Sequence, residues 1–403
     1  MAKPKVAIVK TPKKPGEKEV AAAVRKAIEM VGGLPDKIKK GDTVIIKPNV
    51  VSTNPPEAAV NTDTRVCRAI ADMVKEKGAR PIIAESSGVG IDTDKSLEAA
   101  GYFKLREQGY EVINLKAKGT ELVKVPVPKG KSLKEVELPR VVVEAKAIID
   151  VPKMKCHDQT LVTLSLKNMK GILPDVWKRK LHTTFGIMQG VADLNTVMKP
   201  ALCVVDGILA MEGLGPVYGD PVEMDLVIAG KDPVAVDAVT SEIMGYEPVD
   251  YSIVHVAALT GVGVDDLKQI EVIGEPIAKV KRRFKTSVEA IQEKIPFPKG
   301  FQVLYDEKAC SGCRNQMLSS LVDMANAGVL DQAKGWTVLC GKFEQLPDVS
   351  NVEKLLLIGA CLSRFKDKGV FVQACPPNST DITRALGVKG AMGVSGVGVE
   401  QLG

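Results

Sequence analysis

Short apolar runs alternate with amphipathic stretches over the first two thirds of the chain. The runs have the length of β-strands and lie at residues 5–9, 43–47, 81–85, 147–151, 201–205 and 225–229. Strands that are apolar throughout are typical of parallel sheets buried on both faces. The pattern therefore predicts an α/β fold with a largely parallel sheet covered by helices.

The stretches between the runs carry helix signals. Residues 17–31 and 64–77 place apolar side chains at helical spacing, and glycine follows both stretches. Asp232 followed by Pro233 is a strong helix start, because the aspartate side chain caps free backbone N–H groups and proline fits the first turn. We therefore expect Asp232 to be an N-cap rather than a ligand.

The length of 403 residues exceeds one ordinary core, so we expect two domains. Residues 1–278 form the larger one. Residues 279–300 are basic, then helical, then proline-rich, and we interpret them as a linker. Residues 301–403 form a second, smaller cysteine-rich α/β domain, with strand-like runs at residues 336–339, 355–358 and 370–373.

Composition and charge exclude several function classes. Hydrophobic residues are 45% and charged residues 26% of the chain, as in ordinary globular proteins. The net charge of +6 is spread over interspersed charges and aromatic residues are only 4%, so we expect no nucleic-acid partner. No apolar run approaches the roughly 20 residues of a membrane helix, and the N-terminus lacks signal-peptide features. We expect a cytoplasmic protein with no membrane partner.

The cysteines crowd towards the C-terminus. Five of the eight lie in the last hundred or so residues, at Cys310, Cys313, Cys340, Cys361 and Cys375. The first two form a CxxC motif before a helix, and each of the others follows a predicted strand. Because the carboxyl ends of parallel strands share one edge, we expect these cysteines to converge. Thiols stay reduced in the cytoplasm, so the convergence favours metal or redox chemistry over disulfides.

A 4Fe-4S cluster is the cofactor that this cysteine set favours. We predict that its ligands are Cys310, Cys313, Cys361 and Cys375, with Cys340 as a neighbour or an alternative ligand. A proline follows Cys375, as often happens after the last ligand in cluster loops. Three other interpretations stay open: inert buried cysteines, a structural zinc site, and thioredoxin-like redox chemistry at the CxxC motif.

Loops of the larger domain concentrate polar residues just after the predicted strands. If these loops share one sheet edge, they surround a crevice suited to a small anionic molecule, a carboxylate or a phosphate. We predict substrate binding by Lys47, Asn49, Lys153, Lys167, Asn168, Lys170, Asp206 and Glu212. His157 and Lys155 are the candidate catalytic residues, because neighbouring lysines favour a neutral imidazole that can act as a base.

These polar residues also have ordinary structural interpretations. Loop lysines are commonly solvated, and His157 also suits a surface position or a hydrogen-bonded buried one. Residues 85–90 have the composition of a phosphate-binding loop. The glycine fingerprints of ATP and dinucleotide sites are both absent, so we predict neither ATP nor NAD binding.

Several motifs together resemble one family. IIKPN at 45–49, AESSG at 84–88, VPKMKCH at 151–157, LSLKNMKG at 164–171, VVDGILAMEGLGP at 204–216 and AGKDPVAVDAV at 229–239 are similar to the uncharacterised family called domain of unknown function three-six-two. The resemblance covers about residues 1–275 and implies iron–sulfur binding, because many members carry a ferredoxin-type module, but it implies no particular reaction. This chain lacks the CxxCxxCxxxC run of such modules. It has Cys156-His157 where many members have Thr-His, which leaves the role of Cys156 open.

The sequence leads to one main functional hypothesis and two rivals. The main hypothesis is an iron–sulfur redox protein that binds a small anionic substrate and has a redox protein as partner. If it is an enzyme, we expect an oxidoreductase. The cluster would pass electrons to the substrate site or act there as a Lewis acid. The first rival is a non-redox isomerase or lyase with structural metal and acid–base chemistry at His157 and a lysine. The second is a carrier protein for a cluster or an anionic cofactor.

Overall fold

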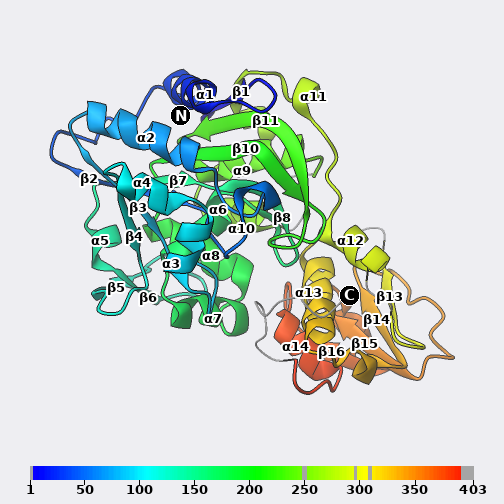
Figure 1. Cartoon of the computed structure of the whole chain (residues 1–403). Coiled ribbons are helices and arrows are strands. Elements are labelled where there is room, and N and C mark those ends of the chain that lie inside the picture. Colours follow the sequence, from blue (N-terminus) through cyan, green and yellow to red (C-terminus); the bar gives the residue numbers. More distant parts are fainter. Residues whose placement is uncertain (1–2, 247–251, 295–296, 307–310, 392–403) are drawn as a thin grey trace.

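The strands form a large sheet, a small sheet and a separate hairpin. The structure is a computed structural model that describes residues 3–246, 252–294, 297–306 and 311–391. The hairpin joins β5 (Leu122–Pro126) and β6 (Glu135–Pro139). Figure 1 shows the two sheets beside each other, with the small sheet built by the C-terminal part of the chain.

The large sheet is mostly parallel. Its order is β12 (Glu271–Gly274), β1 (Lys5–Lys10), β11 (Asp220–Gly230), β10 (Leu202–Glu212), β7 (Ala147–Val151), β2 (Thr43–Pro48), β3 (Arg80–Glu85) and β4 (Glu111–Asn114). β11 runs antiparallel to β1 and β10, and the pairs from β10 across to β4 are all parallel. The hairpin of β8 (Lys153–His157) and β9 (Leu161–Thr163) attaches to β10 through β8. This arrangement confirms the predicted α/β fold class.

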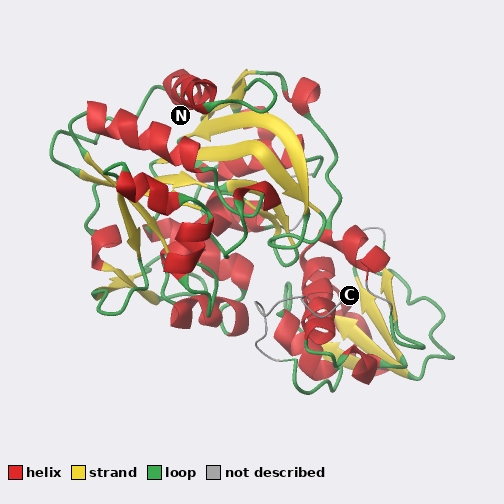
Figure 2. Cartoon of the chain, viewed as in Figure 1, coloured by secondary structure: helices red, strands yellow, loops and turns green. Residues whose placement is uncertain are grey.

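Both faces of the large sheet are buried. On β1, Val6 and Ile8 belong to one hydrophobic core and Ala7 and Val9 to another, because successive side chains of a strand point to opposite faces. The second core packs against α1 (Glu17–Met30), α2 (Thr64–Glu76), α3 (Thr93–Ala99) and α4 (Tyr102–Glu107). The first packs against α5 (Arg140–Val143), α6 (Ser165–Asn168), α7 (Asp175–Thr183), α8 (Ile187–Val197), α9 (Pro233–Ile243) and α10 (Ile253–Leu259). Figure 2 shows these helices around the sheet.

The small sheet has four parallel strands. They are, in spatial and sequence order, β13 (Gln302–Tyr305), β14 (Trp336–Cys340), β15 (Lys354–Ile358) and β16 (Val370–Val372). Val338 and Leu356 lie in a core shared with α13 (Ser311–Asn326) and α14 (Ser379–Ala385). Leu339 and Leu357 lie in a second apolar cluster on the opposite face. The small sheet therefore repeats the two-faced burial of the large one.

The structure contains the predicted strands of the large sheet, some of them with different ends. Residues 201–205 fall at the start of β10 and residues 225–229 at the end of β11, and both strands are longer than predicted. Asp232 is the N-cap of α9, since its side chain accepts hydrogen bonds from two backbone N–H groups of the first turn. The stretch predicted as a linker contains α12 (Ser287–Lys294) and the end of α11 (Ile277–Val280).

Several predictions of local structure are wrong. Asp206 and Glu212 were expected in loops and lie within β10, and Lys167 and Asn168 were expected in a loop and lie in α6. We expected residues 153–157 to form a loop, and they form strand β8. All five residues of β8 are buried, and the apolar Met154 and Cys156 alternate along the strand with polar residues. Pairing with both β10 and β9 stabilises this lysine-containing strand. In the parts of the chain that the structure describes, no helix combines the length and apolar character required to cross a bilayer.

Candidate functional site

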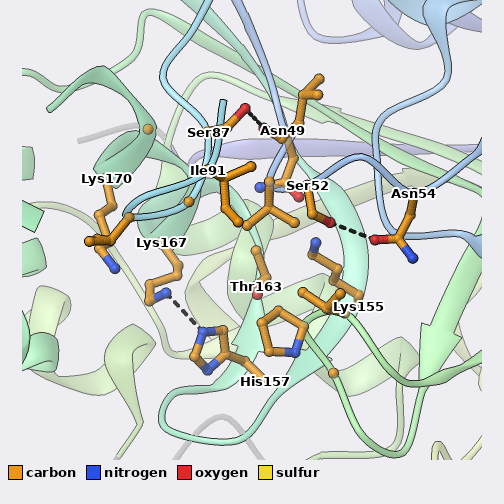
Figure 3. Close-up of a pocket in the computed structure, with 18 of the residues that line it drawn as sticks. Asn49, Ser52, Asn54, Ser87, Ile91, Lys155, His157, Thr163, Lys167 and Lys170 are labelled. Atoms are coloured by element: carbon orange, nitrogen blue, oxygen red, sulfur yellow. Dashed lines mark hydrogen bonds between the residues drawn. The ribbon is translucent and has the colours of Figure 1, made fainter. Parts of the chain in front are cut away.

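A cavity of about 1020 Å³ lies where the large sheet faces helix α13. Loops at the carboxyl ends of β2, β3 and β8 line it, together with α6, α7 and the segment at residues 214–218. Val322, Asp323 and Asn326 of α13 complete the lining. Figure 3 shows Lys155, His157 and Lys167 around the same space. The cavity therefore uses the strand edge where open α/β folds commonly bind ligands, with one wall from the small-sheet region.

Two buried lysines near the cavity are neutralised by carboxylates. The Nζ atom of Lys47 lies 2.8 Å from the Glu85 Oε2 atom, and the Nζ atom of Lys153 lies 2.8 Å from the Asp206 Oδ2 atom. A Cβ atom at Gly171 would lie 2.5 Å from the Lys47 Nζ atom, so only glycine fits against the first pair. These lysines are structural ion pairs, because each has its own buried counter-charge.

Three other cavity lysines have no ion pair to a carboxylate within the described residues. Lys155 donates from Nζ to the Val60 carbonyl oxygen over 2.7 Å. Lys167 contacts the Nε2 atom of His157 at 3.0 Å, and Lys170 contacts the Nε2 atom of His182. Burial lowers the pKa values of Lys155 and Lys170 well below the ordinary lysine range, and it lowers the pKa of Lys167 to about 8. The site thus holds amines without a close salt bridge, and the nearby charge of Asp158 favours the protonated forms of Lys167 and Lys170.

Lys178 on α7 is a fourth buried amine, and its carboxylate neighbour is more distant than those of Lys47 and Lys153. Its Nζ atom donates to the carbonyl oxygen of Ser86 at 2.6 Å, and Asp175 lies 3.7 Å away. Burial first, and the charge of Lys116 second, lower the pKa of Lys178 to about 7. A bound anion would stabilise the protonated form of all four amines.

His157 is a neutral base within this group. Its Nδ1 atom accepts a hydrogen bond from the Gln159 backbone N–H group at 3.0 Å and also lies 2.8 Å from the Asp158 Oδ1 atom. Its Nε2 atom faces Lys167. Burial first, and the charge of Lys167 second, lower the pKa of His157 to about 4. Asp158, His157 and Lys167 therefore form a line of groups along which a proton can move.

A second histidine connects the cavity to the small-sheet region. The Nδ1 atom of His182 lies 2.7 Å from the Oε1 atom of Gln159, and Gln159 donates from Nε2 to the Ser319 hydroxyl of α13 over 2.7 Å. Gln316 of α13 donates from Nε2 to the Gln159 carbonyl oxygen over 3.3 Å. Burial and the charge of Lys170 keep the pKa of His182 well below its ordinary value.

The structure brings together most of the residues that the sequence analysis selected. The cavity is lined by Lys47, Asn49, Lys155, His157, Lys167, Asn168 and Lys170. Lys153 and Asp206 pair with each other outside the lining. Glu212 also lies outside it and accepts hydrogen bonds from Arg282 and from the Lys285 backbone N–H group.

Sequence reasoning did not select several lining residues, which are Asp158, Gln159, Lys178, His182 and Asp323. Lys178 and His182 are four residues apart on α7, a spacing that puts two side chains on one helix face. That spacing was a usable signal. Asp323 had none, because it reaches the cavity only through the packing of α13 against the large-sheet region.

The C-terminal cysteines follow the carboxyl ends of the small sheet. Cys313 is in the first turn of α13 after β13, and Cys340 is the last residue of β14. Cys361 follows β15 and Cys375 follows β16. Backbone hydrogen bonds from Gly359 to Val372 and from Ala360 to Ala374 hold the loops after β15 and β16 together. The predicted ligand Cys310 lies outside the described residues.

The side chains at this edge differ in exposure. Cys340 is fully buried in the core under α13, whereas Cys361 and Cys375 are exposed. A Cβ atom at Gly359 would lie 2.8 Å from the Cys313 sulfur, so the loop after β15 passes directly over that thiol. Within the described ranges, no three His, Cys, Asp or Glu side chains lie close enough to hold a metal ion. Cysteine thiolates are the usual ligands of iron–sulfur clusters, and Cys313, Cys361 and Cys375 each follow a strand of the small sheet.

Comparison with known proteins gives a family and a relative. The family model described as Domain of unknown function (DUF362) matches residues 44–242. This range includes the cavity lysines and none of the C-terminal cysteines. The thylakoid-associated protein sll1697 from Synechocystis sp. is 30% identical over 234 residues, which are 56% of this chain and 70% of the relative.

A solved structure also resembles the chain. The lactate racemase apoprotein from Thermoanaerobacterium thermosaccharolyticum matches with a TM-score of 0.40 and 11% sequence identity. The match covers 84% of this chain and 69% of that chain.

The family model covers much of the large sheet, and the relative is similar over most of its own length. On this basis the chain belongs to the family described as Domain of unknown function (DUF362).

Proposed function

We propose that this protein is an iron–sulfur redox protein that binds a small anionic molecule in the cavity beside α13. The observation that carries the anion-binding part of the proposal is a group of amines around one cavity. Lys155, Lys167 and Lys178 are buried there, and Lys170 is half-buried. Burying an ammonium group without a counter-charge is costly, so a protein keeps such a group where a ligand supplies the charge. A carboxylate or phosphate among these amines would gain charge-assisted hydrogen bonds in a site with little water.

The ligands that we propose for a 4Fe-4S cluster are Cys310, Cys313, Cys361 and Cys375. Cys340 is the buried neighbour of this set. When bound, such a cluster supplies one-electron chemistry. The thiolates would hold it at the carboxyl edge of the small sheet, and a redox protein would exchange electrons there.

The length of α13 favours electron transfer over direct contact between iron and substrate. Cys313 and Asp323 are ten residues apart on this helix, which corresponds to about 15 Å at the usual rise per residue. Asp323 lines the cavity, and no described cysteine does. The substrate would therefore bind away from the iron, and the lysines would carry its negative charge.

Anaerobic purification with metal analysis tests this proposal first. We expect about four irons per chain and an electron paramagnetic resonance signal after reduction with dithionite. We also expect phosphate or citrate to raise the melting temperature, because an anion that binds only the folded state stabilises it. Stoichiometric zinc without iron would contradict the redox role, and the absence of any stabilisation by anions would contradict the binding role.

A specific observation supports a second candidate function, a non-redox isomerase or lyase. The neutral His157 lies between Asp158 and Lys167, an arrangement suited to removing and returning a proton. In this case Lys155 would bind the substrate anion, and the metal would be structural. Turnover that persists in a protein with redox-inactive metal, and that is lost in His157→Gln, would favour this alternative.

A further inference from the structure

The cavity has an apolar side in addition to its lysines. Val51, Ile91 and Val217 line it and are all half-buried, so their side chains are partly exposed towards the open space. Leu214 and Val322 are further half-buried apolar residues of the lining. A small inorganic anion would leave these surfaces in contact with water.

The three residues are linked through shared neighbours. The Ile91 Cγ1 atom and the Val51 Cγ2 atom lie 3.2 Å and 3.6 Å from the Cβ position of Gly88, so both side chains meet at this glycine. Val51 and Val217 pack against the same small cluster, which contains Val60. We call Ile91, Val51 and Val217 the apolar strip, since each shares a neighbour with the next.

The cluster under Val51 and Val217 lies next to Lys155. The Val60 carbonyl oxygen, beside the cluster that supports the strip, accepts the hydrogen bond from the Lys155 Nζ atom at 2.7 Å. An ammonium group and an apolar surface thus adjoin in one site. The volume of about 1020 Å³ is at the upper end of ligand pockets and far exceeds the needs of a phosphate ion.

We infer that the ligand is an amphiphilic organic anion. Its carboxylate or phosphate end lies among Lys155, Lys167 and Lys170, and its apolar body covers the strip of Val51, Ile91 and Val217. This inference rests on the proposed anion site and names the chemical class of the ligand. It explains why one cavity combines buried amines with exposed apolar side chains.

A series of straight-chain carboxylates from acetate to decanoate tests the inference by calorimetric titration of the full-length protein. We expect the affinity to rise roughly fourfold per buried CH₂ group until the strip is covered. Decanol, which has the chain without the charge, should bind much more weakly than decanoate.

Two variants test whether the gain in affinity per CH₂ group comes from the apolar strip. Ile91→Ala should reduce the gain per CH₂ group, because it removes the far end of the strip. Leu259→Ala changes a residue that is 63% exposed and outside the cavity, and it should keep the full gain.

The outcomes separate this inference from the proposal on which it rests. Binding of phosphate and acetate with no dependence on chain length would overturn the amphiphilic ligand and leave the anion site standing. Equal binding of decanol and decanoate would also overturn it. Failure of every anion to bind would remove the anion site itself.

Discussion

The large sheet and the small sheet both gather reactive side chains at the carboxyl ends of parallel strands, but they hold them in different ways. At the large sheet, lysines and histidines are buried and each has a defined partner, such as Val60 for Lys155 or His157 for Lys167. At the small sheet, Cys361 and Cys375 are exposed and follow short strands. The first edge is organised before any ligand binds, whereas the second leaves two thiols open to solvent.

The two edges differ in how their reactive groups affect the free energy of unfolding of the free protein. Desolvated amines in the large sheet destabilise the free protein and favour an anion when one arrives. Free thiols cost little while they keep their protons, and metal binding to the thiolates contributes to folding of the surrounding loops. We therefore expect changes at the two edges to have opposite effects on the stability of the metal-free, anion-free protein.

The largest expected effect is at the small sheet. Cys361→Ser and Cys375→Ser should each reduce the iron content from about four atoms per chain to near zero, because a cubane cluster with a missing thiolate is lost readily. Iron and acid-labile sulfide in anaerobically purified protein measure this. Cys340→Ser should keep its iron, since Cys340 is buried in the core and outside the proposed ligand set. Full iron in Cys375→Ser would show that the set is wrong.

Variants of two lysines on strand β8 distinguish a lysine needed for stability from a lysine needed for anion binding. Lys153→Met should lower the free energy of unfolding by about 3–5 kcal/mol, because it leaves the buried Asp206 carboxylate without its partner. Lys155→Met should raise it by about 1 kcal/mol, since it removes a buried amine that pairs only with a carbonyl oxygen.

Urea unfolding of the metal-matched variants measures both changes. Lys155→Met should also lose the stabilisation that phosphate or decanoate gives to the wild type. A strong destabilisation by Lys155→Met, as large as that of Lys153→Met, would mean that Lys155 is a structural residue.

The pH dependence of stability and of anion affinity tests the role of the buried amine of Lys178. The pKa of Lys178 is about 7 in the folded protein and near the ordinary 10.5 when unfolded, so between these values the unfolded state binds more protons. Stability should therefore rise as the pH increases from 7 towards 10. Anion affinity should fall over the same range, because an anion needs the protonated amine. Glu85, Asp175, Lys47 and Lys116 are the charged groups that act on this amine.

Thermal melts and anion titrations at pH 7, 8 and 9 test this opposition. Lys178→Met should flatten both slopes. Lys199→Met changes a lysine outside the cavity and should leave both as in the wild type. Stability and affinity that change in the same direction with pH would contradict the interpretation of Lys178 as a buried amine that a bound anion keeps protonated.

Local patterns in the sequence predicted the sheets well and the site only in part. Strand β7 matches its predicted range, because an apolar run buried on both faces needs no distant partner to be recognised. The strand β8 was missed since its lysines mask the alternation with Met154 and Cys156, although that period of two was visible. The different roles of Lys153 and Lys155 could not be predicted, because Asp206 and Val60 are distant in sequence.

The smallest expected effect is at the contact between the two sheet regions. Gln159→Ala and Ser319→Ala should each lower the free energy of unfolding by about 1 kcal/mol, because each removes the 2.7 Å hydrogen bond from the Gln159 Nε2 atom to the buried Ser319 hydroxyl. The double variant should cost less than the sum, since both changes remove the same bond, and a double-mutant cycle in urea measures the difference. Gln159→Ala should also weaken decanoate binding slightly, because Gln159 orients His182 in the cavity, whereas Ser319→Ala should weaken it less. Fully additive stability changes would show that this hydrogen bond does not join the anion cavity to the cysteine-bearing helix.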